Sequence, residues 1–187
     1  MEMKLKHRLL SMVLSLLMVL SLIPATVFAA DESTTANVAK IGETGYATIA
    51  AAVSAAQAGD TITLLADVTA DVTISKNITL DLGGKTLTNT GVGKATLTVA
   101  KGATATVKNG SIVGGASYYT IQNNGTATLE DVTATAGNTG SSMIDSWGTL
   151  TITSGTYTGG LNVVKSEEDT TLNISGGTFT LEYATNG

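Results

Sequence analysis

The sequence is poor in residues that cross-link chains or carry out catalysis. Its 187 residues include no cysteine, one proline, one histidine and one arginine. The last three are Pro24, His7 and Arg8, so residues 25–187 contain none of them. Without cysteine there are no disulfides, and stability must come from packing of the chain against itself. Without histidine and arginine, the chemistry available to this part of the chain is narrow.

The first 29 residues have the pattern of a secretory signal peptide. Lys4, Lys6 and Arg8 precede an apolar run over residues 9–23, and the Val-Phe-Ala sequence ending at Ala29 supplies small residues for cleavage. The alternative is an uncleaved membrane anchor, but a run of about fifteen apolar residues is short for a membrane span. We expect cleavage after Ala29 or Ala30, a secreted or cell-surface protein that begins near residue 31, and no membrane contact beyond the signal peptide.

The charge of the remaining chain is negative. Residues 31–187 contain seven lysines and fourteen acidic residues, a net charge of −7. Nucleic-acid binding needs a cationic surface, usually rich in arginine. This composition therefore excludes a nucleic acid as a partner.

A motif recurs along the second half of the chain at intervals of 22, 23 and 22 residues. Its four copies share an apolar residue in the second position, and they read TVKNGSI (106–112), TLEDVTA (128–134), TITSGTY (151–157) and NISGGTF (173–179). Self-similarity at a fixed period of this length is typical of solenoid proteins. The repeat predicts the architecture but leaves the activity open, because many activities occur on solenoids.

Each repeat contains three candidate strands. Before the first corner Ala105 and Val107 alternate with Thr104 and Thr106, which predicts a strand with one buried face. A second short strand follows a corner of Gly, Asn or Asp, and a third set of apolar residues comprises Leu97, Val99, Ile121, Ile144 and Val164. Three strands per coil of about 22 residues predict an all-β fold, a parallel β-helix over residues 61–187.

The two ends of the predicted solenoid differ. Residues 44–60 place Tyr46, Ile49, Val53 and Ala56 on one helical face, which predicts an amphipathic helix that caps the first coil after a linker over residues 30–43. The alternative is a free surface helix within a linker. No cap is apparent at the other end, where the pattern continues to Gly187. We therefore expect the chain to be the first part of a longer protein, an expectation that a stop codon directly after Gly187 would contradict.

Three segments and the repeat phrase resemble a known family. The segments are GYATIAAAV (45–53), GDTITLLADVT (59–69) and NITLDLGGKTL (77–87), and the phrase is ISGGTF (174–179). They resemble the pectin-lyase-like right-handed β-helices of exported surface proteins of Gram-positive bacteria. The resemblance covers residues 44–187. It implies the fold and an extracellular location. It implies no single activity, because the superfamily includes lyases, hydrolases, esterases, tailspikes and adhesins.

The catalytic residues of the enzymes in that superfamily have no counterparts here. β-Helix pectate lyases use an arginine, often beside Ca²⁺, and the related hydrolases use clustered Asp with His, Arg and Lys. In this chain Glu130 and Asp131 are adjacent, so we expect their side chains to diverge unless a corner reorients them, while Asp145 has no partner within its own repeat. We interpret residues 167–169 as a solvated acidic loop rather than a Ca²⁺ site. We predict no catalytic residue, metal site or cofactor in this segment; a later segment of a longer chain remains a possible source of catalysis.

Three aromatic residues form the candidate ligand site. Tyr118 and Tyr119 follow a Gly-Gly pair, and Trp147 lies at a corner about one coil later, so the three side chains are candidates for one exposed patch that stacks on sugars. The alternative is that one of the tyrosines and Trp147 fill gaps at corners of the core. Tyr157 and Phe179 are in register with the core positions, and we expect them to be buried.

The threonines allow another hypothesis. Pairs of the form Thr-X-Thr recur in register, as they do on ice-binding β-solenoids, although Lys108 and Asn173 interrupt the columns and threonine is common in strands. We expect a surface scaffold that acts in adhesion or interaction, with a polysaccharide or cell-surface glycan as partner. The alternatives are the non-catalytic front part of a polysaccharide-degrading enzyme and, with least support, an ice-binding solenoid.

Overall fold

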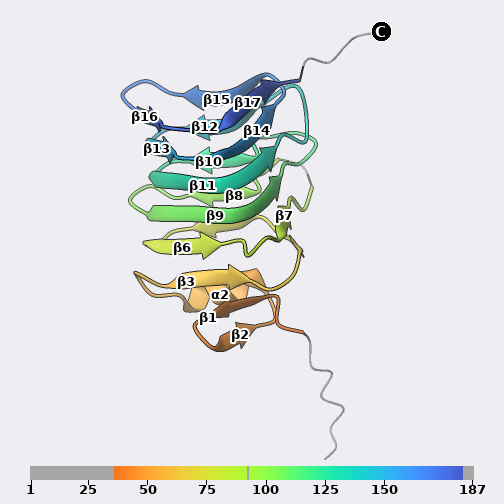
Figure 1. The fold of residues 1–187 in the computed structure, drawn as a ribbon, viewed down its shortest axis with the longest axis vertical. Coiled ribbons are helices and arrows are strands. Elements are labelled where there is room, and N and C mark those ends of the chain that lie inside the picture. Colours follow the sequence, from red (N-terminus) through yellow and green to blue (C-terminus); the bar gives the residue numbers. More distant parts are fainter. Residues whose placement is uncertain (1–35, 92, 183–187) are drawn as a thin grey trace, which may run out of the picture. The chain divides into compact units, whose positions relative to one another are not determined.

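The computed structural model describes residues 36–91 and 93–182, which form one helix and seventeen strands (Figure 1). The predicted signal peptide over residues 1–29 lies outside the described residues. Within the described ranges, no helix is both long enough and apolar enough to cross a membrane. The β-helix prediction is confirmed: about five turns of about 22 residues each stack in a parallel β-solenoid.

The strands form three faces around the core. Face 1 contains β3 (Thr61–Leu64), β6 (Ile78–Asp81), the first halves of β9 (Thr104–Val113) and β11 (Thr126–Thr135), β13 (Thr149–Ile152) and β16 (Thr171–Ile174). Face 2 contains β4 (Val68–Thr69), β7 (Thr86–Thr88), the second halves of β9 and β11, β14 (Gly155–Gly159) and β17 (Thr178–Leu181). Face 3 contains β5 (Val72–Ile74), β8 (Leu97–Val99), β10 (Ile121–Asn123), β12 (Ser142–Ser146) and β15 (Asn162–Ser166).

The register of the strands matches the sequence repeat residue by residue. On face 1 Leu129 pairs with Val107 on one side and with Ile152 on the other, and Ile152 pairs with Ile174. The second and third positions of the repeat also align, through the columns Ile112, Ala134, Tyr157 and Phe179 on face 2 and Leu97, Ile121, Ile144 and Val164 on face 3. The sequence repeat therefore predicts which residues of adjacent coils lie side by side.

The corner between faces 1 and 2 contains fewer residues outside strands than the sequence predicts. In the two central coils the first two predicted strands run as one bent strand, β9 or β11, rather than as two. Asn109 and Asp131 make the bend with φ of 59° and 51°, the left-handed region that asparagine and aspartate enter more readily than most residues. In the next coil the positive φ falls one position later, at Gly155, which pairs with Val132 and has φ of 117°.

The inward side chains of successive coils form one continuous apolar core. Val107, Leu129, Ile152 and Tyr157 have no exposed surface, which confirms the prediction that Tyr157 is buried. Phe179 stacks on Tyr157 with ring centroids 5.1 Å apart, yet it is 37% exposed. The prediction that Phe179 is buried is therefore wrong for its outer side, because no coil among the described residues covers the last coil.

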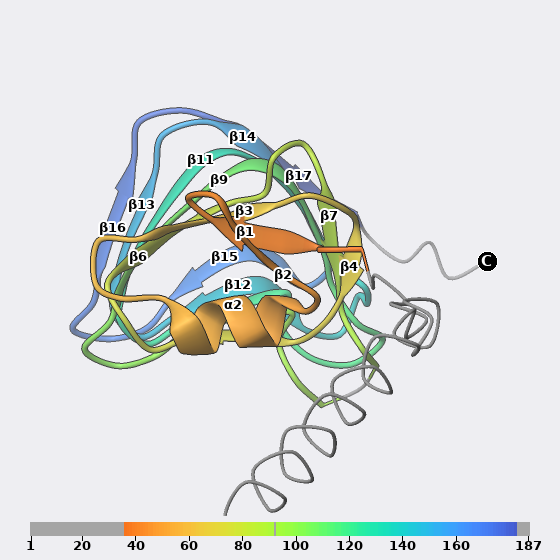
Figure 2. The same ribbon diagram turned by 90° about the horizontal axis from the view of Figure 1, so that it is seen from below.

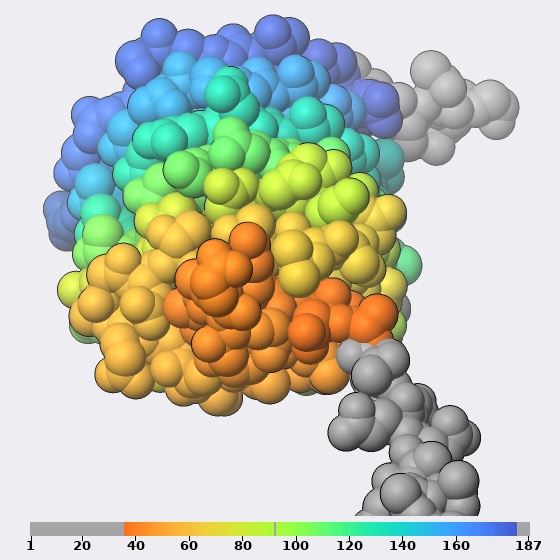
Figure 3. Space-filling view, turned by 60° about the horizontal axis from the view of Figure 1, so that its bottom comes forward, coloured from red at the N-terminus to blue at the C-terminus, as the bar shows by residue number. Residues whose placement is uncertain are grey.

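The N-terminal cap is present, but its helix is shorter than predicted. Helix α2 spans Ile49–Ala55, not residues 44–60, because Thr48 accepts a hydrogen bond from the Ala51 amide at 3.1 Å and so begins the helix late. Its buried residues Ile49 and Ala52 join the core. Figures 2 and 3 show this segment lying across the open end of the first coil.

The predicted linker over residues 30–43 is also wrong in part. Ala39–Ile41 forms strand β1, which pairs antiparallel with β2 (Thr44–Tyr46) and with β3. Gly42, with φ of 55°, makes the tight turn between β1 and β2. Strands of three residues are too short to show a periodic pattern, and β1 forms because the first coil has a free edge that needs a partner.

Replacing Leu129 with alanine tests the core assignment. We expect the free energy of unfolding to fall by about 2–5 kcal/mol, because the cavity lies between two coils and cannot collapse fully. Urea denaturation measures the change. The adjacent outward-facing variant Thr128→Ala is the control, with an expected loss below about 1 kcal/mol. Equal losses in both variants would contradict the assignment of Leu129 to the core.

Candidate ligand-binding site

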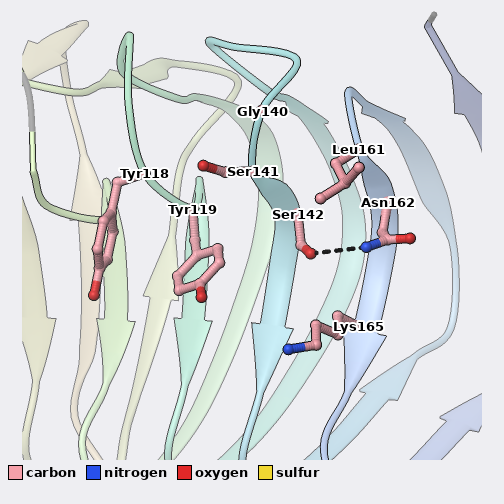
Figure 4. Close-up of a pocket in the computed structure, with 8 residues that line it drawn as sticks. All are labelled: Tyr118, Tyr119, Gly140, Ser141, Ser142, Leu161, Asn162 and Lys165. Carbon is pink, nitrogen blue, oxygen red and sulfur yellow. Dashed lines mark hydrogen bonds between the residues drawn. The ribbon is translucent and has the colours of Figure 1, made fainter.

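A surface hollow of about 250 Å³ lies on the outer side of face 3 (Figure 4). It forms where the starts of β12 and β15 lie side by side, since Ser142 pairs with Asn162. The loop that precedes β10 contributes two tyrosines from the neighbouring coil. The lining residues are Tyr118, Tyr119, Gly140, Ser141, Ser142, Leu161, Asn162 and Lys165.

The two tyrosine rings form the aromatic side of the hollow. Their centroids are 4.8 Å apart with an interplanar angle of 54°, and both side chains point the same way along face 3 (Figure 4). Asn138 holds their loop in place, because its side-chain amide donates hydrogen bonds to the carbonyl oxygens of Gly115 at 3.2 Å and of Tyr118 at 2.9 Å. The loop that carries the tyrosine pair is therefore positioned by hydrogen bonds from a side chain of the next coil to its backbone.

The opposite side of the hollow combines polar and apolar groups. Asn162 Nδ2 donates a hydrogen bond to Ser142 Oγ at 3.1 Å, which leaves the amide oxygen of Asn162 and the hydroxyl proton of Ser142 for other partners. Leu161 is 57% exposed beside them. Such a lining matches a ligand that has both apolar faces and hydroxyl or amide groups.

A cluster of charged residues continues from the hollow along face 3. Asp145 lies between the inward-facing Ile144 and Ser146, so its side chain is on the outer side, but it is only 1% exposed. Trp147 Nε1 donates a hydrogen bond to Asp145 Oδ2 at 2.8 Å. Lys165, the strand partner of Asp145, forms an ion pair with Glu167.

The two carboxyl groups of this cluster have pKa values displaced in opposite directions. Burial raises the pKa of Asp145; the hydrogen bond from Trp147 lowers it, and the neighbouring carboxyl group of Glu167 raises it again. The pKa of Glu167 is lowered, first by the hydrogen bond from Lys165. Burial also raises the pKa of the Tyr119 hydroxyl, with a further contribution from the charge of Asp145. Asp145 therefore binds its proton more tightly than an ordinary aspartate, and Glu167 binds its proton less tightly than an ordinary glutamate.

The structure places the three predicted site residues in two groups. Tyr118 and Tyr119 lie together in the hollow, whereas Trp147 does not line it. Trp147 is 58% exposed, so the alternative in which it fills a gap in the core is wrong. It connects to the hollow through Asp145, whose strand partner Lys165 is one of the lining residues.

Asp145 has partners on the next coil that its own sequence repeat by itself does not reveal. The expectation that Asp145 has none holds only within its own repeat; one coil later it meets Lys165 and Glu167. Glu167 is correspondingly not part of a fully solvated loop, since its side chain is 16% exposed. The alignment of Ile144 with Val164 was the signal for this contact, because it places Asp145 directly beside Lys165.

Over residues 36–91 and 93–182, no group of three or more His, Cys, Asp or Glu side chains is arranged to hold a metal ion. Comparisons of the chain with protein-family models, with curated proteins and with solved structures gave no match. The site must therefore be interpreted from its own geometry.

Replacing Trp147 with phenylalanine tests the link to Asp145. The variant removes the donor to a buried carboxyl group, so we expect the pKa of Asp145 to rise and the free energy of unfolding at neutral pH to fall by about 1–3 kcal/mol. NMR titration of the Asp145 carboxyl carbon and urea denaturation measure the two effects. Tyr118→Phe is the control and should leave the pKa of Asp145 unchanged. An unchanged pKa in the Trp147 variant would contradict the structural assignment.

Proposed function

We propose that this protein is an extracellular β-helical scaffold that acts in adhesion or interaction and binds carbohydrate in the hollow on face 3. The observation that carries the proposal is the tyrosine pair, with ring centroids 4.8 Å apart, opposite the polar pair Ser142 and Asn162. Sugars present apolar ring faces that pack against aromatic rings, and hydroxyl groups that need donors and acceptors.

The volume of the hollow favours one unit of a polysaccharide over a separate drug-sized molecule as the ligand. Its volume of about 250 Å³ is below the about 300–1,000 Å³ of pockets for drug-sized molecules. A single sugar unit of a polysaccharide fits an open hollow of this kind, while neighbouring units extend over the surface toward Trp147. The exposed indole supplies a second place for stacking.

The extracellular location rests on the N-terminal sequence. The basic, apolar and small-residue regions of residues 1–29 have the order of a signal peptide. The resemblance to pectin-lyase-like surface proteins of Gram-positive bacteria supports the same location and the role in display. A solenoid with a helical cap on its first coil and a long outer surface suits that role, because the outward positions vary without disturbing the core.

Binding is favoured over catalysis because of how the two carboxyl groups lie. Glycosidases place two carboxyl groups about 5–9.5 Å apart, on either side of the bond that is cleaved. Asp145 and Glu167 instead lie beside each other: Lys165 is the strand partner of Asp145 and pairs with Glu167, and the two carboxyl groups shift each other's pKa. If the chain is instead the front part of a polysaccharide-degrading enzyme, the hollow holds the substrate while other residues cleave it. Release of reducing ends from bound polysaccharide would reveal that alternative.

Removal of both tyrosine rings tests the proposal. We expect the double variant Tyr118→Ala/Tyr119→Ala to bind at least tenfold more weakly than the wild type, because both stacking surfaces are lost, a change of about 1.4 kcal/mol. Glycan arrays identify the saccharide, and pull-down on that immobilised polysaccharide measures the loss. The double variant Thr133→Ala/Thr156→Ala on face 2 is the control. Unchanged binding by the tyrosine variant would exclude the hollow as the site.

The threonine columns favour a second candidate function, ice binding. On face 1 Thr104, Thr126, Thr149 and Thr171 form one column, and Thr61, Thr79, Thr106, Thr128 and Thr151 form another. Hydroxyl groups then recur about 6.7 Å apart along each strand and about 4.8 Å apart between strands. The next column contains the charged residues Asp81, Lys108 and Glu130, which interrupt a surface that would order water.

Thermal hysteresis separates the two candidate functions. Ice binding predicts a freezing point below the melting point for the protein that begins at residue 31, and loss of the effect in Thr128→Glu/Thr151→Glu because two charges break the columns. Nanolitre osmometry measures both temperatures. Equal freezing and melting points of the wild-type protein would exclude ice binding, and carbohydrate binding would be unaffected.

A further inference from the structure

Asp145 is the most completely buried ionisable group on face 3, and one of its oxygens has no donor. Oδ2 accepts the indole hydrogen bond from Trp147, whereas Oδ1 has no hydrogen-bond partner and is shielded from solvent. Glu167 approaches Asp145 from the next coil, because it forms an ion pair with Lys165, the strand partner of Asp145; its charge raises the pKa of Asp145. Two ionised carboxylates in contact offer only acceptors and repel each other.

Protonation of one of the two carboxyl groups removes the repulsion and supplies the missing hydrogen-bond donor. If Asp145 is protonated, its free oxygen becomes a donor, and the Glu167 carboxylate is an acceptor within reach. Lys165 then neutralises the remaining negative charge through its ion pair with Glu167. Every group in the cluster has a partner in this state, and the burial of Asp145 carries no unpaired charge.

We propose that Asp145 and Glu167 share one proton, which holds the Glu167 side chain over Asp145, and that loss of this proton uncovers the Asp145 carboxylate beside Trp147. Asp145 is a positioning residue in this scheme, because it orients the indole and retains Glu167. Under the proposed function, the uncovered carboxylate accepts hydrogen bonds from sugar hydroxyl groups; that consequence alone rests on the proposed function.

The charged and titratable groups around Asp145 determine the direction of the change. Lys165 and Glu167 face it from β15 and the turn after it. Tyr119 faces it from the loop before β10, and Trp147 lies just after its own strand, β12. Burial and Glu167 raise the pKa of Asp145, so the proton is lost above the pH at which an ordinary aspartate, with a pKa of about 3.9, ionises. The covered state therefore exists at low pH and the uncovered state at higher pH.

The single tryptophan of the chain reports this transition without any ligand. We expect the emission and the acrylamide quenching of Trp147 to change with pH at a midpoint above that of an ordinary aspartate, while far-UV circular dichroism stays constant. In Asp145→Asn the amide donates to Glu167 at every pH, so the transition should disappear. In Glu167→Gln the negative charge is absent, so the midpoint should fall.

Glu168→Gln is the matched control, because its side chain is exposed next to Glu167 and does not affect the pKa of Asp145. Its midpoint should equal that of the wild type. NMR titration of the Asp145 carboxyl carbon in the wild-type protein gives the result independently if a variant fails to fold. An ordinary aspartate pKa, or a fluorescence transition that persists in Asp145→Asn, would overturn the proposal. Neither measurement uses a saccharide. The shared-proton proposal is therefore tested independently of whether the protein binds carbohydrate.

Discussion

The parallel pairing of each strand with the strand one coil later is the interaction on which the structure depends. A single coil has a few inward apolar side chains, and they cannot offset the conformational entropy lost when about 22 residues become ordered. Pairing with the next coil satisfies the backbone donors and acceptors and closes the core at the same time. The repeat length is therefore a physical requirement, because a coil of a different length would move apolar side chains out of their column unless its corner absorbed the extra residues.

The same pairing creates the candidate site. Tyr119, Ser142 and Asn162 lie on three successive coils, and they meet only because the strands of face 3 are in register. The cluster of Asp145, Lys165 and Glu167 arises in the same way, from residues about one coil apart. Each outward side chain lies beside the residues at the same position of the two neighbouring coils, so the outer surface varies from coil to coil while most inward positions stay apolar.

The two ends of the described solenoid show which strand edges and core side chains the pairing between coils leaves uncovered. At the first coil, α2 covers the core and β1 pairs with the free edge of β3. At the last described coil, Leu172, Ile174 and Phe179 have more than a third of their surface exposed, although each occupies a core position of the repeat. Burial is therefore a property of the neighbouring coil as well as of the residue.

The sequence alone determined the fold class, the coil length and the register, because these follow from the period of apolar residues, and strand pairing preserves that period from coil to coil. It also singled out Tyr118, Tyr119 and Trp147, as large aromatics outside the apolar columns. Only the tertiary structure decided that Trp147 belongs with Asp145 rather than in the hollow, that Glu167 lies against Asp145, and that residues 39–41 form a strand. These contacts depend on corner geometry and on which edges are free, and neither leaves a periodic trace in the sequence.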